Sequence, residues 1–301
     1  MHVVSIGDYY ADVSDNGEHS APANLRDRLA PLCRERHRRI DRFIELSLLG
    51  SGLCAANLPT GIDLESQAAL YIASGLASMS NIVKVQQQIF MHGNPPKPAN
   101  FINTLSNSAG YYVARNLGLR GKNIFVSREN SSFEAALQLI ALDFVTGASR
   151  CALLGVVDEC PPPLDQQRKR MRLGEDALLA EGSHWFFLRP ASELVPSFES
   201  LASISMPQTL KSASEVFKWL ELQTLKNTAI HLNQCALLTT DCADLVAGVP
   251  RFQAPLGHYG ARSAGISSRF ITTGDHSSLI SINKDKVGRF HVMRIDRMPK
   301  A

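Results

Sequence analysis

The sequence predicts an α/β protein with a parallel sheet that is covered by helices on both faces. Residues 123–127 (NIFVS) and 151–157 (CALLGVV) are short apolar runs typical of buried strands, and residues 132–144 between them have the apolar spacing of a helix. A strand, a helix and a second apolar strand form a βαβ unit, which places the two strands parallel in one sheet. With 301 residues, of which 45% are apolar, the chain can bury a sizeable core.

The N-terminal part is predicted to hold one strand followed by helices. Residues 2–6 form a β-branched run that ends at Gly7 and predicts an opening strand, and the polar stretch 12–22 predicts a loop. Apolar residues then recur at helical spacing. This spacing predicts two helices within 24–55, a mostly helical stretch over 64–88, and an amphipathic helix over 99–117 that ends at Gly118.

The C-terminal part is predicted to hold shorter elements. The proline run at 161–163 and the basic stretch 166–172 indicate a surface excursion. After it we expect a strand over 184–188, a helix over 214–225, a strand over 230–239, and a terminal hairpin built from 273–282 and 290–295.

Composition and charge exclude several classes of protein. The formal net charge is only +3, and the basic cluster at 34–39 has no interleaved aromatic residues on which a single-stranded nucleic acid would stack. The six cysteines form no CxxC pair, so we expect reduced thiols and no metal site, and we also expect no cofactor. The amino terminus lacks a secretory leader and no segment is apolar enough to span a membrane, so a cytoplasmic protein is expected.

Five segments carry motifs in a specific order. The longest, Pro98 to Glu159, contains a helix and turn ending in LGLRG, then a strand, a turn, a long helix and an apolar strand. RIDRF stands before it at 39–43, and AEG (180–182), GHYGA (257–261) and the stretch 274–282 stand after it. In this order the segments resemble the β-ketoacyl-acyl carrier protein synthases, whose RMDRF, GEGA, GHxxGAxG and FGGTNA motifs occupy the corresponding places.

The resemblance implies a fold and a division of the chain. It predicts the thiolase-like layered α/β/α/β/α fold with mixed sheets, in a version shorter than a full ketosynthase. It divides the chain into an N-terminal half, residues 1–189, and a shortened C-terminal half, residues 190–301, within one compact unit.

The resemblance also implies where a ketosynthase would carry its catalytic residues. Its nucleophilic cysteine, activated at the N-terminal end of a buried helix, falls at Asn130, which Ser131 and Ser132 follow. The second of the family's two histidines matches His258, and the lysine that precedes it is Gln253. An asparagine amide is not a nucleophile, so we expect no catalytic residue for condensation.

Other interpretations of these residues are open at this point. In place of the family's first histidine the chain offers only residues 232–237. Asn130 is alternatively the cap of the following helix, and His258 is alternatively a buried core histidine. Cys235 is a buried thiol or a displaced nucleophile. The basic cluster at 34–39 is a solvated helix face or a surface that attracts the acidic acyl carrier protein.

The predicted function is that of a catalytically silent chain-length factor. Such a subunit pairs with an active ketosynthase and shapes the tunnel of the acyl or polyene chain, in type II polyketide, aryl polyene or fatty-acid biosynthesis. We expect residues 98–119 near the interface between the two subunits. The alternative is a thiolase-fold acyltransferase or hydrolase in which Ser131 or Ser132 acts with His258. A third possibility is a scaffold homodimer that only docks carrier protein.

Overall fold

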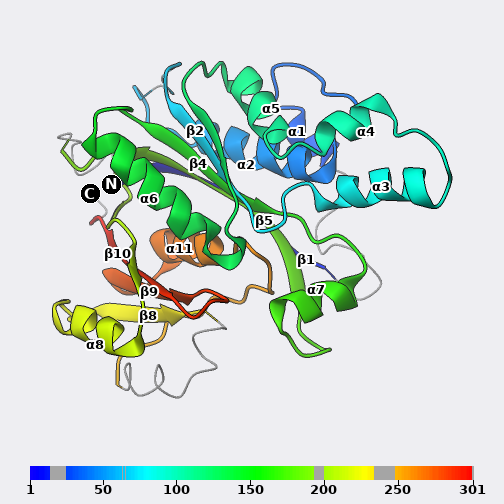
Figure 1. Ribbon diagram of the computed structural model, residues 1–301. Coiled ribbons are helices and arrows are strands. Elements are labelled where there is room, and N and C mark those ends of the chain that lie inside the picture. The colour runs from blue at the N-terminus through cyan, green and yellow to red at the C-terminus, as the bar shows by residue number, and fades with distance from the viewer. Residues whose placement is uncertain (14–24, 63, 65, 193–199, 234–247, 300–301) are drawn as a thin grey trace.

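The strands of the chain pair into one mixed sheet (Figure 1). The computed structural model describes residues 1–13, 25–62, 64, 66–192, 200–233 and 248–299. The order of strands across the sheet is β3-β2-β4-β5-β1-β6-β10-β9-β8, and β7 pairs with β10 off this path. The strands are β1 (His2–Val13), β2 (Ala69–Ala73), β3 (Asn123–Val126), β4 (Ala152–Asp158), β5 (Leu179–Arg189), β6 (Ala202–Ile204), β7 (Gln208–Leu210), β8 (Thr228–Leu232), β9 (Ser278–Lys284) and β10 (Phe290–Arg297).

Parallel and antiparallel pairs are combined in this sheet. β2 pairs in parallel with β3 on one side and with β4 on the other, and β8 pairs in parallel with β9. The other pairs are antiparallel. The two parts of the sheet, β3-β2-β4-β5-β1 and β6-β10-β9-β8, meet through a short pairing of His2 with Ser203 and Val3 with Ala202.

Helices form layers outside and between these two parts (Figure 1). α1, α2 and α5 cover the outer face of the first part, and α8 covers the outer face of the second. α6 (green in Figure 1) and α11 (orange) lie between the two parts, which confirms the predicted α/β/α/β/α order. The helices are α1 (Arg26–Leu29), α2 (Arg42–Ala56), α3 (Met79–Phe90), α4 (Pro98–Asn103), α5 (Ser108–Leu117), the 3₁₀ turn η1 (Glu129–Ser131), α6 (Ser132–Val145), α7 (Leu164–Met171), α8 (Ala213–Glu221) and α11 (Arg262–Thr273).

The core between the two parts fixes the position of α6. Phe133, in the first turn of α6, stacks on Phe186 of β5 with ring centroids 5.5 Å apart, and both rings are fully buried. Burial of a large apolar side chain contributes about 1.5–3 kcal/mol to stability. The N-terminal turn of α6 is therefore held firmly against the sheet.

Several predicted elements are confirmed. The strands predicted over 123–127, 151–157 and 184–188 are β3, β4 and the second half of β5, and the helix over 132–144 is α6. β9 and β10 form the terminal antiparallel hairpin, although β9 begins at Ser278 rather than at residue 273. No helix within the described residues is long and apolar enough to cross a membrane.

Other predicted elements were wrong. The stretch 64–88 is not mostly helical, because Ala69–Ala73 is the buried strand β2 and the helix α3 begins only at Met79. The single helix predicted over 99–117 is two helices, α4 and α5. The opening strand continues to Val13, and the surface excursion contains the helix α7. Helix α11 had not been predicted, and residues 234–239 of the predicted strand lie outside the described residues.

Candidate functional site

The turn between β3 and α6 presents Asn130 at the N-terminal end of a buried helix. β3 ends at Val126, and the 3₁₀ turn η1 leads directly into α6. Glu129 has a φ of 50°, a left-handed conformation that costs a residue with a side chain on the order of 1 kcal/mol or more. In α/β enzymes a strained turn from strand to helix can carry a nucleophile, and in this turn the partly exposed residue after Glu129 is an asparagine.

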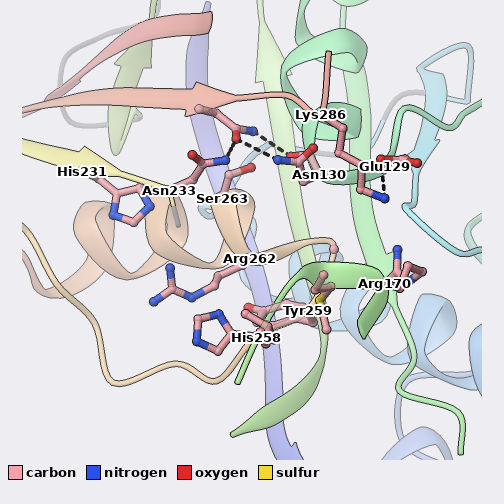
Figure 2. Close-up of a pocket in the computed structure, with 14 residues that line it drawn as sticks. Glu129, Asn130, Arg170, His231, Asn233, His258, Tyr259, Arg262, Ser263 and Lys286 are labelled. Atoms are coloured by element: carbon pink, nitrogen blue, oxygen red, sulfur yellow. Dashed lines mark hydrogen bonds and ion pairs between the residues drawn. The ribbon is translucent and has the colours of Figure 1, made fainter. Parts of the chain in front are cut away.

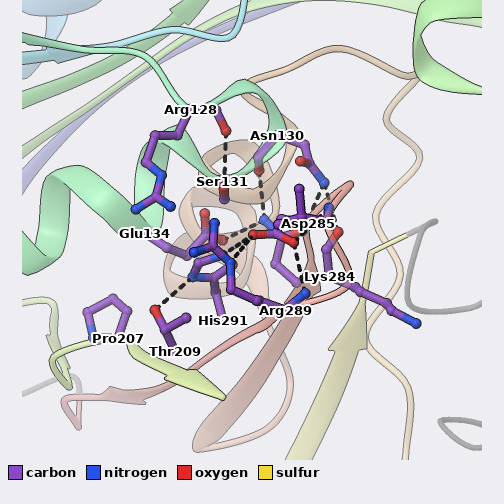
Figure 3. Close-up of polar contacts among 12 residues, drawn as sticks. Arg128, Asn130, Ser131, Glu134, Pro207, Thr209, Lys284, Asp285, Arg289 and His291 are labelled. Atoms are coloured by element: carbon purple, nitrogen blue, oxygen red, sulfur yellow. Dashed lines mark hydrogen bonds and ion pairs between the residues drawn. The ribbon is translucent and has the colours of Figure 1, made fainter. Parts of the chain in front are cut away.

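The Asn130 amide binds the end of β9 (Figure 3). Its Nδ2 donates to the carbonyl of Lys284 at 3.0 Å and to Oδ1 of Asn283 at 3.3 Å. In return, Nδ2 of Asn283 donates to the Asn130 carbonyl at 2.7 Å. Residue 131 is the N-cap of α6 and makes no side-chain cap, so the interpretation of Asn130 as the helix cap was wrong.

Ser131 and Ser132 are buried and hydrogen-bonded to the backbone. Both are only 2% exposed. The Ser131 hydroxyl donates to the Arg128 carbonyl at 3.0 Å. The Ser132 hydroxyl lies 2.8 Å from the Glu129 carbonyl and accepts from the Arg128 N–H at 2.8 Å. Neither serine lines the pocket beside Asn130, and neither is hydrogen-bonded to His258, so the structure does not bring together the predicted serine and histidine.

Asn130 and His258 line one pocket, together with residues from the ends of β8 and β9 and from the start of α11 (Figure 2). The cavity has a volume of about 80 Å³. Gln253 is exposed and is not among the lining residues. The predicted positions of the cysteine and of the second histidine thus meet in space, and the position of the lysine does not join them.

A histidine that sequence reasoning missed lies in the same pocket. His231 is the penultimate residue of β8, and burial lowers its pKa to about 4, with Arg262 adding to the effect. Burial also lowers the pKa of His258, and Arg262 contributes there as well. Both rings are therefore neutral at pH 7. The first histidine had been sought at 232–237, and the signal that was overlooked is a lone histidine in the apolar strand TAIHL.

The described cysteines lie away from this pocket. Cys33, Cys54, Cys151 and Cys160 are free, and none of them lines it. Burial raises the pKa of Cys54 and of Cys160 to about 12, which makes these thiols poor nucleophiles. Cys235, the alternative nucleophile, lies outside the described residues. Within the described part of the chain, no cysteine faces Asn130 or the two histidines.

Comparisons with known proteins identify the fold. No family model and no curated protein matches the sequence. The ishigamide ketosynthase/chain length factor is 15% identical, with a TM-score of 0.70, over 99% of this chain and 100% of that one. A β-ketoacyl synthase from Burkholderia phymatum is 12% identical, with a TM-score of 0.72, over 99% of this chain and 100% of that one. The fold is the thiolase-like fold of the ketosynthases. The PfaC keto synthase-chain length factor is also similar, with 12% identity and a TM-score of 0.72, over 100% of this chain and 43% of that one.

Beneath the pocket, this ketosynthase fold buries an acidic side chain. Glu134 of α6 is fully buried, and its Oε1 accepts from Nδ2 of Asn283 at 3.1 Å. Burial raises the pKa of Glu134 to about 7. The hydroxyl of Ser263 lies near this carboxyl group and acts to lower its pKa. Among the described residues, however, neither this hydroxyl nor Oε2 of Glu134 makes a hydrogen bond.

A buried series of hydrogen-bonded side chains supports the loop that carries His258. His184 Nε2 lies 2.7 Å from the hydroxyl of Tyr259, and Asp8 binds the other ring nitrogen of His184. Gly182 and Gly265 make room for this pair. A Cβ at 265 would overlap the Tyr259 hydroxyl and lie 2.9 Å from His184 Nε2. The loop is therefore positioned by two glycines and one histidine beneath it.

Proposed function

We propose that this chain is a catalytically silent, chain-length-factor-like subunit that pairs with an active ketosynthase in polyketide or fatty-acid biosynthesis. The observation that carries the proposal is the occupant of the turn before α6. By the resemblance, Asn130 stands where a ketosynthase carries its nucleophile, and its amide donates hydrogen bonds to Lys284 and Asn283. An amide cannot accept an acyl group from a thioester as a thiolate does, so the partner would supply the nucleophile.

One face of the molecule has the features of an interface with a second subunit. β3 is an edge strand, and edge strands offer unpaired backbone groups to another strand. Beside it, α4, α5 and their connection expose apolar side chains that a monomer would normally bury. We call this the α4–α5 surface, and its members are Phe101, Ile102, Leu105 and Tyr111.

The α4–α5 surface falls within residues 98–119, the segment expected near the partner. A partner with the same fold presents an edge strand of its own, so two sheets can pair side by side. One of the similar structures is a ketosynthase/chain length factor, which supports a paired arrangement for this chain.

The small pocket supports a role in shaping the tunnel rather than in holding the growing chain. A cavity of about 80 Å³ accommodates a few water-sized molecules and no long acyl chain. In the proposed pair, the acyl or polyene chain lies in the partner's tunnel, and this subunit closes the tunnel's far end.

Carrier protein is the proposed third component. The arginines at 34, 36, 38 and 39 are exposed on the connection between α1 and α2. An acidic carrier protein would be steered toward such a cluster by charge complementarity. One similar structure is a type II acyl-carrier protein in complex with its ketosynthase, at 12% identity and a TM-score of 0.62, over 98% of this chain and 99% of that one.

The test is co-expression with the ketosynthase encoded next to this chain, followed by co-purification and intact-mass analysis after loading with acyl and malonyl carrier protein. We expect a one-to-one complex in which only the partner gains acyl mass. Acyl mass on this chain, lost in Ser131→Ala or Ser132→Ala, would instead support the acyltransferase alternative. A stable homodimer that does not bind the ketosynthase would support the scaffold alternative.

A further inference from the structure

The pocket that Asn130 lines carries an excess of positive charge. Among the described residues that line it, Arg170, Arg262 and Lys286 are cationic, and Glu129 is the one carboxylate. Lys286 and Glu129 form an ion pair at 2.9 Å and neutralise each other. Among the described residues, no carboxylate lies within ion-pair distance of Arg170 or Arg262.

Arg262 is the more constrained of the two unpaired cations. It is the first residue of α11, and burial lowers its pKa. Its Nε donates only to the carbonyl of Leu256, at 3.4 Å. Figure 2 shows its guanidinium between His231 and His258, whose neutral rings supply no counter-charge. A partly buried cation without an anion is costly, so the site favours an anionic ligand.

A second observation independently indicates a ligand at the same place. Ser263, the next residue of α11, lines the pocket and is 6% exposed, yet its hydroxyl has no hydrogen-bond partner among the residues that the structure describes. The first turn of α11 also lacks a side-chain cap. The N-terminal end of a helix of this length carries partial positive charge, which favours an oxyanion.

We propose that this pocket binds one small oxyanion, of the carboxylate or phosphate class, between the guanidinium of Arg262 and the hydroxyl of Ser263. The cavity of about 80 Å³ limits the bound group to a few heavy atoms. The site lies in this chain alone and does not depend on the proposed partner. Its failure would therefore leave the co-purification experiment unaffected.

The experiment measures thermal stability and binding heat of the full chain with sodium acetate, sodium malonate or inorganic phosphate, against sodium chloride at matched ionic strength. We expect saturable stabilisation by at least one of these oxyanions. Acetate and malonate together would identify a carboxylate site, and phosphate alone would identify a phosphate site. Arg262→Gln should weaken binding at least tenfold, because it removes the charge that the anion meets.

Arg269→Gln is the matched control, because Arg269 stands on the same helix, does not line the pocket, and its side chain is 44% exposed in a 4.0 Å ion pair with Asp8. It should change the affinity less than twofold. Ser263→Ala, which keeps the helix intact, should weaken binding about threefold, consistent with the loss of one hydrogen bond. Without an anion, Arg262→Gln should melt at the wild-type temperature or above it. No saturable response to any of the three salts, or equal responses of Arg262→Gln and the wild type, would overturn the site.

Discussion

The side-chain amide of Asn130 donates to the main-chain carbonyl of Lys284 at 3.0 Å, and this bond joins the turn before α6 to the end of β9. Asn233, at the end of β8, donates to the same carbonyl at 3.2 Å. Asn283 binds both of these amides through its Oδ1. Three asparagines from three separate segments therefore form one amide cluster at the N-terminal end of α6.

This arrangement predicts unequal costs for two substitutions of Asn130. In Asn130→Ala, Lys284 and Asn283 keep their hydrogen bonds from Asn233, so the free energy of unfolding should fall by only about 1 kcal/mol. In Asn130→Asp, an anionic oxygen replaces the donor opposite the Lys284 carbonyl, and the loss should be about 3 kcal/mol at pH 7. Urea unfolding measures both values. Asn94→Ala, at an exposed loop position, is the control, and equal losses in the two Asn130 variants would contradict the described geometry.

Glu134 predicts a pH dependence of stability. Its folded pKa of about 7 lies above its ordinary value of 4.5, so the folded chain binds the proton more tightly than the unfolded chain. Below pH 4.5 both states are protonated and the group has no effect. Stability is lost as the pH rises from about 4.5 through 7, by up to about 3 kcal/mol for a shift of this size.

Glu134→Gln tests this prediction because glutamine can still accept from Asn283 and cannot ionise. The variant should be more stable than the wild type at pH 8 and equally stable near pH 4.5, as measured by guanidinium unfolding at both pH values. Glu129→Gln, in a half-exposed ion pair, should show little of this trend. A gain that is the same at both pH values would mean that the carboxyl group of Glu134 is not the cause.

The parts of the fold that could be predicted are those in which local pattern and tertiary position agree. Residues 151–157 are apolar because β4 is buried on both faces, and Phe133 and its helical neighbours face the same core. β2 was misassigned because ALYIA is equally buried on both faces but short, and a continuous apolar run without alternation has no period that separates strand from helix. Its place between β3 and β4 decides the matter, and that pairing is not visible in the local sequence.

The residues of the candidate site could be predicted only where the sequence still resembles a motif of the family. His258 was found through GHYGA, whereas His231 stands in a segment with no recognisable motif and joins the pocket through the parallel pairing of β8 with β9. Arg262 was not singled out, because its significance is that no carboxylate of the described residues pairs with it, and only the arrangement of β8, α11 and the turn reveals this. Tertiary pairing, rather than composition, determines these contacts.

The contact between Tyr259 and His184 predicts a steric effect that a second substitution relieves. Gly265→Ala should lower the free energy of unfolding by about 2 kcal/mol or more, because its methyl group would overlap the Tyr259 hydroxyl. In the Tyr259→Phe background the same change should cost less, since the overlapping oxygen is gone. A double-mutant cycle from urea unfolding measures the difference. Gly174→Ala, at an exposed glycine with open space around it, should be nearly neutral. If the two changes are additive, the glycine is not there to accommodate the hydroxyl.

The α4–α5 surface predicts a selective loss of partner binding. Phe101 and Leu105 are each 59% exposed, so Phe101→Glu and Leu105→Glu should leave the stability of the isolated chain within about 0.5 kcal/mol of the wild type. At the centre of an interface, each buried charge should weaken association by about 2 kcal/mol, or roughly thirtyfold. The double variant should then fail to co-purify with the ketosynthase.

Leu222→Glu is the control for that experiment, since Leu222 is 84% exposed and directly follows α8, which covers the opposite outer layer. It introduces the same charge at an apolar surface position and should co-purify like the wild type. Loss of binding in both Leu222→Glu and the double variant would indicate a general effect of added negative charge. Binding by the double variant would place the partner elsewhere. Loss of co-purification only in the Phe101 and Leu105 variants would show that the partner binds the face beside β3. The reason is that the α4–α5 surface and the surface at Leu222 are both apolar and differ only in position.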